Sequence, residues 1–302
     1  MLNTPEGFRS GFAALVGRPN VGKSTLLNKL VGQKVAIMSD KPQTTRHKIH
    51  SVLTRNEAQI VFLDTPGIHK PKHKLGEYMV DVALGALREV DVVLFLVEAT
   101  DDPGAGDKYI AEQLKEIKTP IFLMINKIDL IKKEEVLEKI SRYKDLLPFA
   151  ELIPVSAIDG ENVDRLIQTI IKYLPEGPQY YPTDMITDRP ERFIMAEIIR
   201  EKVLHLTSEE IPHSVAVVVE QIQERNNGVV ALNAVIFTER ESQKAILIGK
   251  GGQMLKEVGR RAREEIENLL GSKVYLELWV KVKKDWRNKM ADLRNLGFSQ
   301  EE

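Results

Sequence analysis

Residues 17–24 read GRPNVGKS, the GxxxxGK[ST] spacing with which a glycine-rich loop holds the phosphates of a nucleotide. The apolar run at residues 12–16 precedes this loop as a buried strand would, and residues 23–30 follow it with the composition of a helix. In that order the backbone N–H groups of residues 20–24 converge on the phosphates, and the helix N-terminus favours their negative charge. We therefore predict a nucleoside triphosphate site rather than a glycine-rich turn without a ligand.

The individual positions of this loop have separate chemical tasks. Gly17 and Gly22 leave room for a close approach between backbone and phosphate, and Lys23 is expected to reach the β- and γ-phosphates. The Ser24 hydroxyl is expected to coordinate Mg²⁺. The loop residues predicted to bind the nucleotide are Gly17, Arg18, Pro19, Asn20, Val21, Gly22, Lys23, Ser24 and Thr25.

A second motif indicates which base is bound. Asn126, Lys127 and Asp129 follow directly on the apolar run at residues 121–125, in the NKxD pattern. The Asp129 carboxylate can accept hydrogen bonds from both N1–H and the exocyclic amine of guanine, whereas adenine does not offer this pair of donors. The stem of Lys127 is expected to lie over the base, and Asn126 is expected to tie this loop to the phosphate loop. The predicted ligands are therefore GTP and GDP rather than ATP.

Ser156 and Ala157 follow another apolar run, residues 152–155. A backbone N–H of this pair could donate to the guanine oxygen, so both residues are included in the predicted site. Two small residues are common in any sequence, and this assignment depends on their position after the other motifs.

The residues expected around the γ-phosphate come from two further segments. The DTPG sequence that begins at Asp64 ends an apolar run, which would place Asp64 on Mg²⁺ through water and the Gly67 N–H at the γ-phosphate. Residues 43–46, QTTR, lie where a nucleotide-sensing loop belongs; Thr45 is the preferred Mg²⁺ ligand and Thr44 is the alternative. The residues predicted near the γ-phosphate are Asp64, Thr65, Pro66, Gly67 and Ile68.

Composition limits the classes of protein. The 302 residues suffice for two domains, and the absence of cysteine excludes disulfides, zinc fingers and cysteine nucleophiles. The formal net charge of −1 conceals 12 Lys and Arg against 6 Asp and Glu between residues 244 and 289. The N-terminus lacks the apolar core of a signal peptide, and no apolar run approaches the ~20 residues of a membrane span. We therefore expect a soluble, cytoplasmic protein with one basic segment.

The order of elements predicts two domains. Apolar runs alternate with helix-length segments such as residues 74–89 and 132–147, which indicates an α/β domain with a doubly wound, mainly parallel sheet covered by helices on both faces. Four prolines between residues 174 and 190 indicate a linker. The predicted boundaries are residues 1–174 for the first domain, 175–190 for the linker and 191–302 for the second domain.

The second domain has a different pattern. It predicts the order helix, strand, strand, helix, helix, strand, an α+β fold with a hairpin whose turn is NNG. The predicted elements are a helix at residues 191–206, strands at 215–223 and 229–237, a helix that ends at residue 270 and a strand at 274–282. A GxxG sequence, residues 249–252, lies between an apolar run and a long basic helix.

This GKGG loop and the basic helix after it resemble a prokaryotic, type II KH domain, in which the GxxG loop clamps about four nucleotides of single-stranded nucleic acid. Lys250 would neutralise a phosphate and Ile248 would give the bases an apolar platform. The simpler alternative is a glycine-rich helix start on a solvated basic surface. The residues predicted to bind RNA are Ile248, Gly249, Lys250, Gly251, Gly252, Lys256, Arg260 and Lys283. Further residues that either extend a basic groove or keep an edge strand soluble are Lys281, Lys284, Trp286, Arg287 and Lys289.

The motifs GRPNVGKS, QTTR, DTPG, NKID and VSA occur in the order of the small GTPases of the translation-factor class, and residues 10–174 resemble that family. The resemblance implies a Ras-like fold and hydrolysis of GTP by in-line attack of water. One residue departs from the Ras pattern, because Ile68 stands where a glutamine orients the water. The chain resembles the subgroup with a hydrophobic residue there, in which K⁺ can supply the missing positive charge and Asn20 matches the residue that binds it. The implied catalytic residues are Lys23, Thr45, Gly67 and Asn20, with slow intrinsic turnover.

The combination of this GTPase domain with a short linker and a KH domain resembles the Era family of bacterial ribosome-assembly GTPases over essentially the whole chain. That resemblance implies a monomer that binds the 3′ end of 16S rRNA and assists maturation of the 30S ribosomal subunit, with GTP opening the KH surface for RNA. Peripheral association with the inner membrane is also ascribed to the family. One alternative is a KH-like domain that docks a protein, against which the intact GKGG loop argues. Another, a tRNA-modifying GTPase, would need a further catalytic or folate-binding domain.

Overall fold

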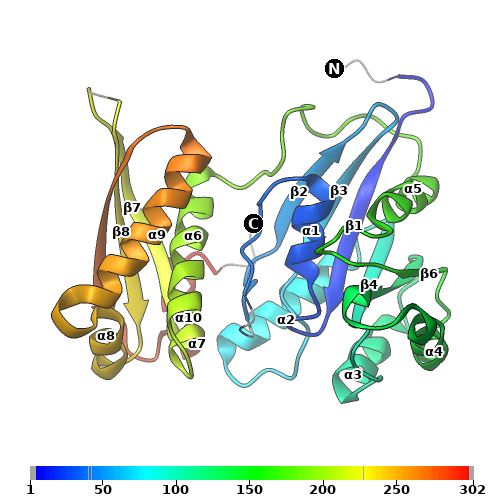
Figure 1. Cartoon of the computed structure of the whole chain (residues 1–302), viewed down its shortest axis with the longest axis horizontal. Helices are drawn as coiled ribbons and strands as arrows, with labels where there is room; N and C mark the ends of the chain where they lie inside the picture. The colour runs from blue at the N-terminus through cyan, green and yellow to red at the C-terminus, as the bar shows by residue number, and fades with distance from the viewer. Residues whose placement is uncertain (1–4, 40, 42, 227, 299–302) are drawn as a thin grey trace. The chain divides into compact units, whose positions relative to one another are not determined.

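The computed structural model describes residues 5–39, 41, 43–226 and 228–298. Within them the chain forms two compact units, the first built mainly from the residues up to Asp188 and the second mainly from Arg189 onward. Each unit has its own sheet (Figure 1). Over the described residues, no helix has both the length and the apolar character that crossing a membrane requires.

The first unit is built around a six-stranded sheet with the strand order β2-β3-β1-β4-β5-β6. Its strands are β1 (Arg9–Gly17), β2 (Ile49–Thr54), β3 (Ala58–Asp64), β4 (Val92–Glu98), β5 (Ile121–Asn126) and β6 (Glu151–Pro154). β2 runs antiparallel to β3, and all other neighbours are parallel. The prediction of a doubly wound, mainly parallel sheet is confirmed. The loops that follow β1, β3, β5 and β6 therefore meet at one edge of the sheet, where ligands bind in this class of fold.

Helices cover both faces of this sheet, because its central strands are apolar on both sides (Figure 1). The helices are α1 (Lys23–Val31), α2 (Lys74–Ala86), α3 (Ala105–Leu114), α4 (Lys133–Tyr143) and α5 (Val163–Tyr173). α1 and α5 contact each other and β1. On the other face, α2, α3 and α4 contribute Ala83, Ile110 and Tyr143 to a core that includes Val16, Leu63 and Val97 of the strands.

β2 is an addition to the predicted pattern. This edge strand follows the segment of Thr45 and is held by antiparallel pairing to β3 and by a bridge between Ser51 and Thr187. Its sequence, IHSVLT, has polar residues inside a short apolar run, so tertiary pairing rather than local preference defines it.

The predicted linker is in large part packed onto the first unit. The buried side chain of Gln59 accepts hydrogen bonds from the N–H groups of Tyr180 (2.8 Å) and Tyr181 (2.9 Å) and donates to the Tyr181 carbonyl oxygen (2.9 Å). A buried amide must satisfy its donors and acceptors, and Gln59 does so with this segment and with Thr54 Oγ1, to which its Nε2 donates at 2.8 Å. Up to Asp188 the segment belongs to the first unit, so the covalent connection that remains between the units is short.

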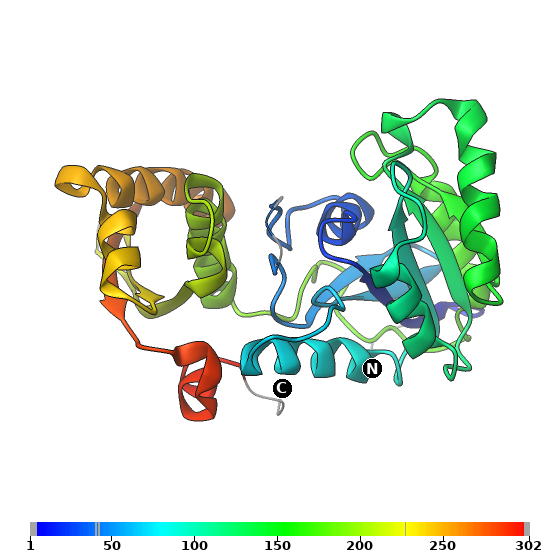
Figure 2. The same cartoon turned by 90° about the horizontal axis from the view of Figure 1, so that it is seen from below.

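The second unit contains a three-stranded sheet with the order β7-β8-β9, in which β7 and β8 are antiparallel and β8 and β9 are parallel. Its elements are α6 (Glu191–Leu206), α7 (Ile211–Ser214), β7 (Ala216–Glu224), β8 (Val230–Thr238), α8 (Glu241–Ile248), α9 (Gln253–Leu270), β9 (Val274–Val282) and α10 (Met290–Asn295). α6 and α9 pack together on one face of the sheet (Figure 2). The predicted KH order is confirmed, and α7 and α10 are additional short helices; Asn227 of the predicted turn lies outside the described residues.

The segment after β9 is expected either to extend a basic groove or to keep an edge strand soluble, and the structure differs for two of its residues. Trp286 is fully buried, its Nε1–H donates to the Ser214 carbonyl oxygen at 2.9 Å, and its ring stacks on Phe298 with the centroids 5.8 Å apart. Arg287 forms an ion pair with Glu239 at 2.6 Å. Trp286 and Arg287 therefore stabilise the interior of the second unit and do not extend a basic groove.

Candidate nucleotide and RNA sites

The phosphate loop lies between β1 and α1, as predicted, and two other motifs enclose it. Gly22 has a left-handed backbone (φ 96°), and a Cβ there would lie 2.2 Å from Nδ2 of Asn126. A Cβ on Gly67 would lie 2.9 Å from the backbone nitrogen of Pro19. Both glycines are thus required by a close approach of the NKID and DTPG segments to the loop.

Lys23 is the buried cation of this loop. Its Nζ donates to the carbonyl oxygens of Gly17 (3.1 Å) and Arg18 (2.9 Å), which holds the ammonium group within the loop. Burial disfavours the charged form and lowers the pKa of Lys23 to about 8, although the Asp64 carboxylate opposes this shift. A bound triphosphate would restore the preference for the charged form.

Because only protonated Lys23 attracts phosphate, we expect GTP affinity to fall as the pH rises through the pKa of about 8. Affinity should be about fourfold weaker at pH 8.5 than at pH 7. Calorimetric titration with a non-hydrolysable GTP analogue, in two buffers of different ionisation enthalpy, should show proton uptake on binding near pH 8. An affinity that stays constant over this range, without proton uptake, would contradict the role of Lys23.

Three oxygen-bearing side chains form a cluster near Lys23. Ser24 Oγ donates to Asp64 Oδ2 at 3.0 Å and lies 3.0 Å from Thr45 Oγ1, which donates to Asp64 Oδ2 at 3.2 Å. Asp64 is fully buried, and its Oδ1 has no hydrogen-bond partner within the described part of the chain. Burial raises the pKa of Asp64, an effect that Lys23 and the two hydroxyl groups oppose. A buried carboxylate oxygen beside two hydroxyls fits Mg²⁺, whose charge would favour the ionised carboxylate. The structure thus brings the three predicted metal ligands together.

The rest of the DTPG segment has structural contacts. Thr65 Oγ1 donates to the Leu15 carbonyl oxygen at 2.7 Å, and Pro66 is buried. Ile68 is 1% exposed and belongs to the core cluster of the sheet. The Ile68 side chain therefore contributes packing and has no polar group with which to orient water.

Asn126 joins the base-binding loops to the phosphate loop. Its Nδ2 donates to the Val21 carbonyl oxygen at 2.8 Å, as predicted, and its Oδ1 accepts from the Ala157 N–H at 3.1 Å. One backbone N–H of the Ser156–Ala157 pair is predicted to face the guanine oxygen; in this structure the Ala157 N–H is directed at Asn126, and the Ser156 N–H donates to the Glu161 carbonyl oxygen at 3.2 Å. Ser156 Oγ donates to Asp129 Oδ1 at 2.6 Å, which holds the exposed carboxylate in one orientation.

Two loop residues have side-chain partners that their motifs do not indicate. Lys127 Nζ lies 2.8 Å from Glu98 at the end of β4, so the direction of the Lys127 stem is fixed by an ion pair. The Arg18 guanidinium pairs with Asp101 (2.7 Å) and Asp107 (2.8 Å), so only the backbone of Arg18 is left for the nucleotide. Val21 is buried and Thr25 lies in the first turn of α1.

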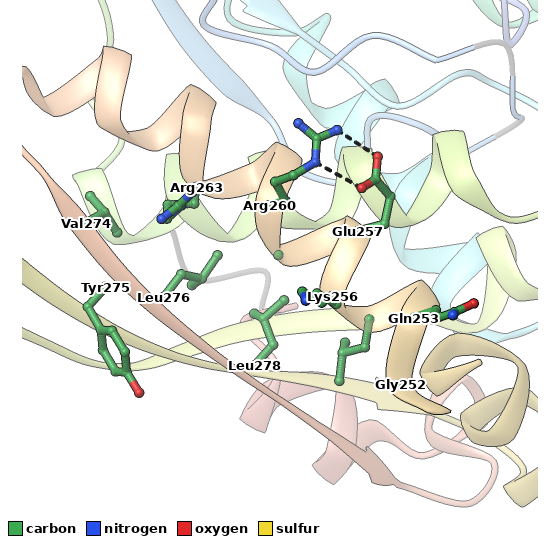
Figure 3. A pocket seen from close by; sticks show the side chains of 12 residues that line it. Gly252, Gln253, Lys256, Glu257, Arg260, Arg263, Val274, Tyr275, Leu276 and Leu278 are labelled. Carbon is green, nitrogen blue, oxygen red and sulfur yellow. Dashed lines mark hydrogen bonds and ion pairs between the residues drawn. The ribbon is translucent and has the colours of Figure 1, made fainter. Parts of the chain in front are cut away.

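A groove of about 750 Å³ lies between the first half of α9 and β9 (Figure 3). Lys256, Arg260 and Arg263 line it from one side of α9, since they are spaced three or four residues apart. Leu276 and Leu278 line it from β9. The other lining residues are Gly252, Gln253, Leu255, Glu257, Gly259, Val274 and Tyr275. Basic side chains near an apolar wall suit single-stranded nucleic acid, because phosphates and bases need different surroundings, although Arg260 is turned toward Glu257 (Figure 3).

The GxxG loop contributes Gly252 to the lining of this groove. Gly249, Gly251 and Gly252 all have positive φ (74°, 61° and 78°), and a Cβ on Gly249 would lie 2.7 Å from Cβ of Met254. Lys250 is exposed between them. Gly249 is therefore required by its close contact with Met254, whereas Gly251 and Gly252 have open space around them and a left-handed backbone that glycine adopts most readily.

The other residues predicted to contact RNA do not all lie free at the groove. Ile248 is half-buried and packs against the core of the second unit. Arg260 lines the groove but is paired with Glu257 at 2.8 Å. Lys283 is not among the lining residues and forms an ion pair with Asp292 at 3.0 Å. The structure thus does not bring Lys283 to this groove.

Sequence reasoning misses part of the groove. Arg263 follows Arg260 by three residues and could be assigned from helical periodicity. Leu276 and Leu278 alternate with the exposed Tyr275, and such alternation ordinarily indicates core-facing residues. Their partial exposure to a groove therefore has no signal in the sequence.

Comparison with known proteins matches both units. A family model described as 50S ribosome-binding GTPase matches residues 12–127, and a KH domain model matches residues 210–287. A curated relative, GTPase Era of Staphylococcus haemolyticus (strain JCSC1435), is 57% identical over 294 residues, which cover 97% of this chain and 98% of the relative.

Two solved structures share the fold over nearly the whole chain. The crystal structure of Era in complex with MgGDPNP and nucleotides 1506–1542 of 16S ribosomal RNA has a TM-score of 0.94 and 47% identity, and covers 97% of this chain and 99% of that chain. A single-residue variant of Aquifex aeolicus Era bound to GDP and AlF₄⁻ has a TM-score of 0.94 and 46% identity. The match covers 97% of this chain and 100% of that chain. With such identity over almost its full length and with both domain models matched, the chain belongs to the Era family of GTPases.

Proposed function

We propose that this chain is a GTP-operated switch that binds the 3′ end of 16S rRNA and assists maturation of the 30S ribosomal subunit. One observation carries the proposal: guanine-nucleotide loops and a basic GxxG groove occur in one chain, and a relative with 47% identity was solved with MgGDPNP and nucleotides 1506–1542 of 16S rRNA. The test is a titration of labelled RNA with the sequence of this 3′ end against the full chain in each nucleotide state. A shuffled RNA of the same length is the control.

We assign hydrolysis to the loops after β1 and β3 and to the segment before β2 that carries Thr45. Lys23 would place its charge on the β- and γ-phosphates, and Gly67 would offer its N–H to the γ-phosphate. Ser24, Thr45 and Asp64 would hold Mg²⁺, which neutralises developing negative charge when bound. Positioning and electrostatics supply the rate enhancement, because phosphoryl transfer to water needs little covalent participation by the protein.

We infer slow intrinsic turnover, because Ile68 stands at the position of a water-orienting residue and is packed in the core. A monovalent cation would then supply charge near the β- and γ-phosphates, and Asn20, which has a left-handed backbone in the loop (φ 68°), is the residue proposed to bind it.

GTP hydrolysis is expected to be ~10-fold or more faster in potassium than in sodium at the same ionic strength, because a charge placed at the transition state is worth at least this much. Asn20→Ala should abolish the difference, whereas Asn20→Asp, which keeps an oxygen ligand, should retain part of it. Equal steady-state rates of the unaltered chain in the two salts would refute potassium activation and leave the GTPase assignment intact.

The cellular setting rests on the family resemblance. We propose a monomer in the cytoplasm that acts on the 30S subunit and associates peripherally with the inner membrane.

A further inference from the structure

The guanidinium of Arg18 connects the phosphate loop to α3. Its Nε donates to Asp107 Oδ1 at 2.8 Å, and its NH2 group donates to Asp101 Oδ2 at 2.7 Å. The first helical turn of α3 is shaped for this contact, since a Cβ on Gly106 would lie 2.6 Å from Cδ of Arg18. The Arg18 side chain therefore lies between two carboxylates and the backbone of Gly106, where any side chain in place of glycine would collide with it.

Asp107 is held as firmly as its partner. Its side chain has no exposed surface, and its Oδ2 accepts a hydrogen bond from the Gly104 N–H at 3.0 Å, at the start of α3. A fully buried carboxylate is costly unless it is paired, and Arg18 supplies the compensating charge. The pair is thus a fixed contact between the loop and the helix rather than a variable surface interaction.

The part of the loop next to Arg18 needs such support. Asn20 adopts a left-handed backbone (φ 68°), which asparagine tolerates better than most residues but which is still less favourable than the right-handed conformation, so contacts on either side help to hold it. On one side of Asn20 the Val21 carbonyl oxygen is held by Asn126 at 2.8 Å. On the other side, the side chain of Arg18 is held by Asp101 and Asp107.

We propose that Arg18 and Asp107 are positioning residues for GTP hydrolysis, whose ion pair holds the phosphate loop in the shape that receives the triphosphate. The inference rests on the proposed catalytic use of this loop. Neither side chain needs to touch the nucleotide, because the effect passes through the backbone of residues 18–20. Asn126 and Arg18 would then fix the loop from opposite sides of Asn20.

Asp102 provides a matched control. It is the neighbour of Asp101 and is also paired, at 2.9 Å to Lys139, with a second contact to Arg142. Both partners lie on α4, and none of the contacts of Asp102 within the described residues reaches the phosphate loop. Loss of the Asp102 charge therefore removes an ion pair of the same region, a more exposed one than that of Asp107, and leaves both carboxylate partners of Arg18 in place.

The test compares full-length Arg18→Met, Arg18→Lys, Asp107→Asn and Asp102→Asn in steady-state GTP hydrolysis, with the thermal unfolding midpoint of each variant. We expect Arg18→Met and Asp107→Asn to lower kcat by ~10- to 100-fold, since displacing a loop by about 1 Å can have effects of this size. Arg18→Lys, which keeps one ion pair, should recover part of the rate, and Asp102→Asn should match the unaltered chain.

Unaltered kcat in Arg18→Met and Asp107→Asn would overturn the proposal, as would a loss fully explained by unfolding at the assay temperature. An equal loss in Asp102→Asn would also overturn it. Absence of GTP hydrolysis in the unaltered chain would instead refute the proposed function, so the two failures are distinguishable.

Discussion

Asp129→Asn is expected to weaken GTP binding by roughly 10- to 150-fold, the equivalent of losing a charge-assisted hydrogen bond worth about 1.5–3 kcal/mol. The carboxylate accepts from two donors of guanine with its two oxygens, whereas an amide has one acceptor oxygen and its NH₂ group would face the second donor. Ser156 holds Asp129 in place at 2.6 Å, so the substituted side chain should keep the same orientation. The variant should instead bind xanthosine triphosphate, whose oxygen at position 2 accepts from the amide N–H.

Competition binding with GTP, ATP and xanthosine triphosphate measures this change of base preference. Asp164→Asn is the control, because Asp164 is an exposed aspartate of α5 that pairs with Arg55. Equal affinity of the unaltered chain for ATP and GTP, or no gain of xanthosine triphosphate binding in Asp129→Asn, would contradict the assignment of the base site.

Gly251→Asp is expected to reduce affinity for the 3′-end RNA by at least ~100-fold, because it adds a negative charge where phosphates are expected to lie. The fold should persist. The left-handed backbone of Gly251 (φ 61°) is one that Asp and Asn tolerate, and no atom lies within 4 Å of a Cβ placed there. Titration of labelled RNA at fixed salt, with circular dichroism of the same samples, measures both expectations.

Two variants separate charge from shape. Gly251→Asn has nearly the same size as Gly251→Asp without its charge, and should bind RNA much more tightly. Gly228→Asp places the same charge at a glycine of similar backbone (φ 74°) and open surroundings, in the β7–β8 turn. Full RNA binding by Gly251→Asp, or an equal loss in Gly228→Asp, would show that the GxxG loop is not the phosphate clamp.

The sequence predicts those parts of the site that depend on local order. Strand, glycine loop and helix are contiguous around Lys23, and Asp64 and Asn126 each end a strand. Because the carboxyl ends of parallel strands meet at one sheet edge, their order is enough to bring Ser24 and Asp64 together. The KH elements are similarly contiguous, so their order follows from hydrophobic periodicity.

Contacts between segments far apart in the sequence could not be predicted. Arg18 and Asp107 are 89 residues apart, and Gln59 holds Tyr181, 122 residues later. Neither pair has a pattern of its own, because any exposed arginine or glutamine would look the same in the sequence. The groove could not be predicted for the same reason, because the partial exposure of Leu276 and Leu278 depends on how α9 packs over β9.

The most direct test of a GTP-operated RNA switch is the affinity of the full chain for the 3′-end RNA with GDP and with a non-hydrolysable GTP analogue bound, at fixed salt. We expect RNA to bind more tightly with the analogue than with GDP, by roughly 5- to 150-fold for a typical coupling free energy of about 1–3 kcal/mol. By thermodynamic linkage, RNA should then tighten the binding of the analogue, relative to GDP, by the same factor. Equal RNA affinities in the two nucleotide states would contradict the account, because GTP would then not control the RNA groove.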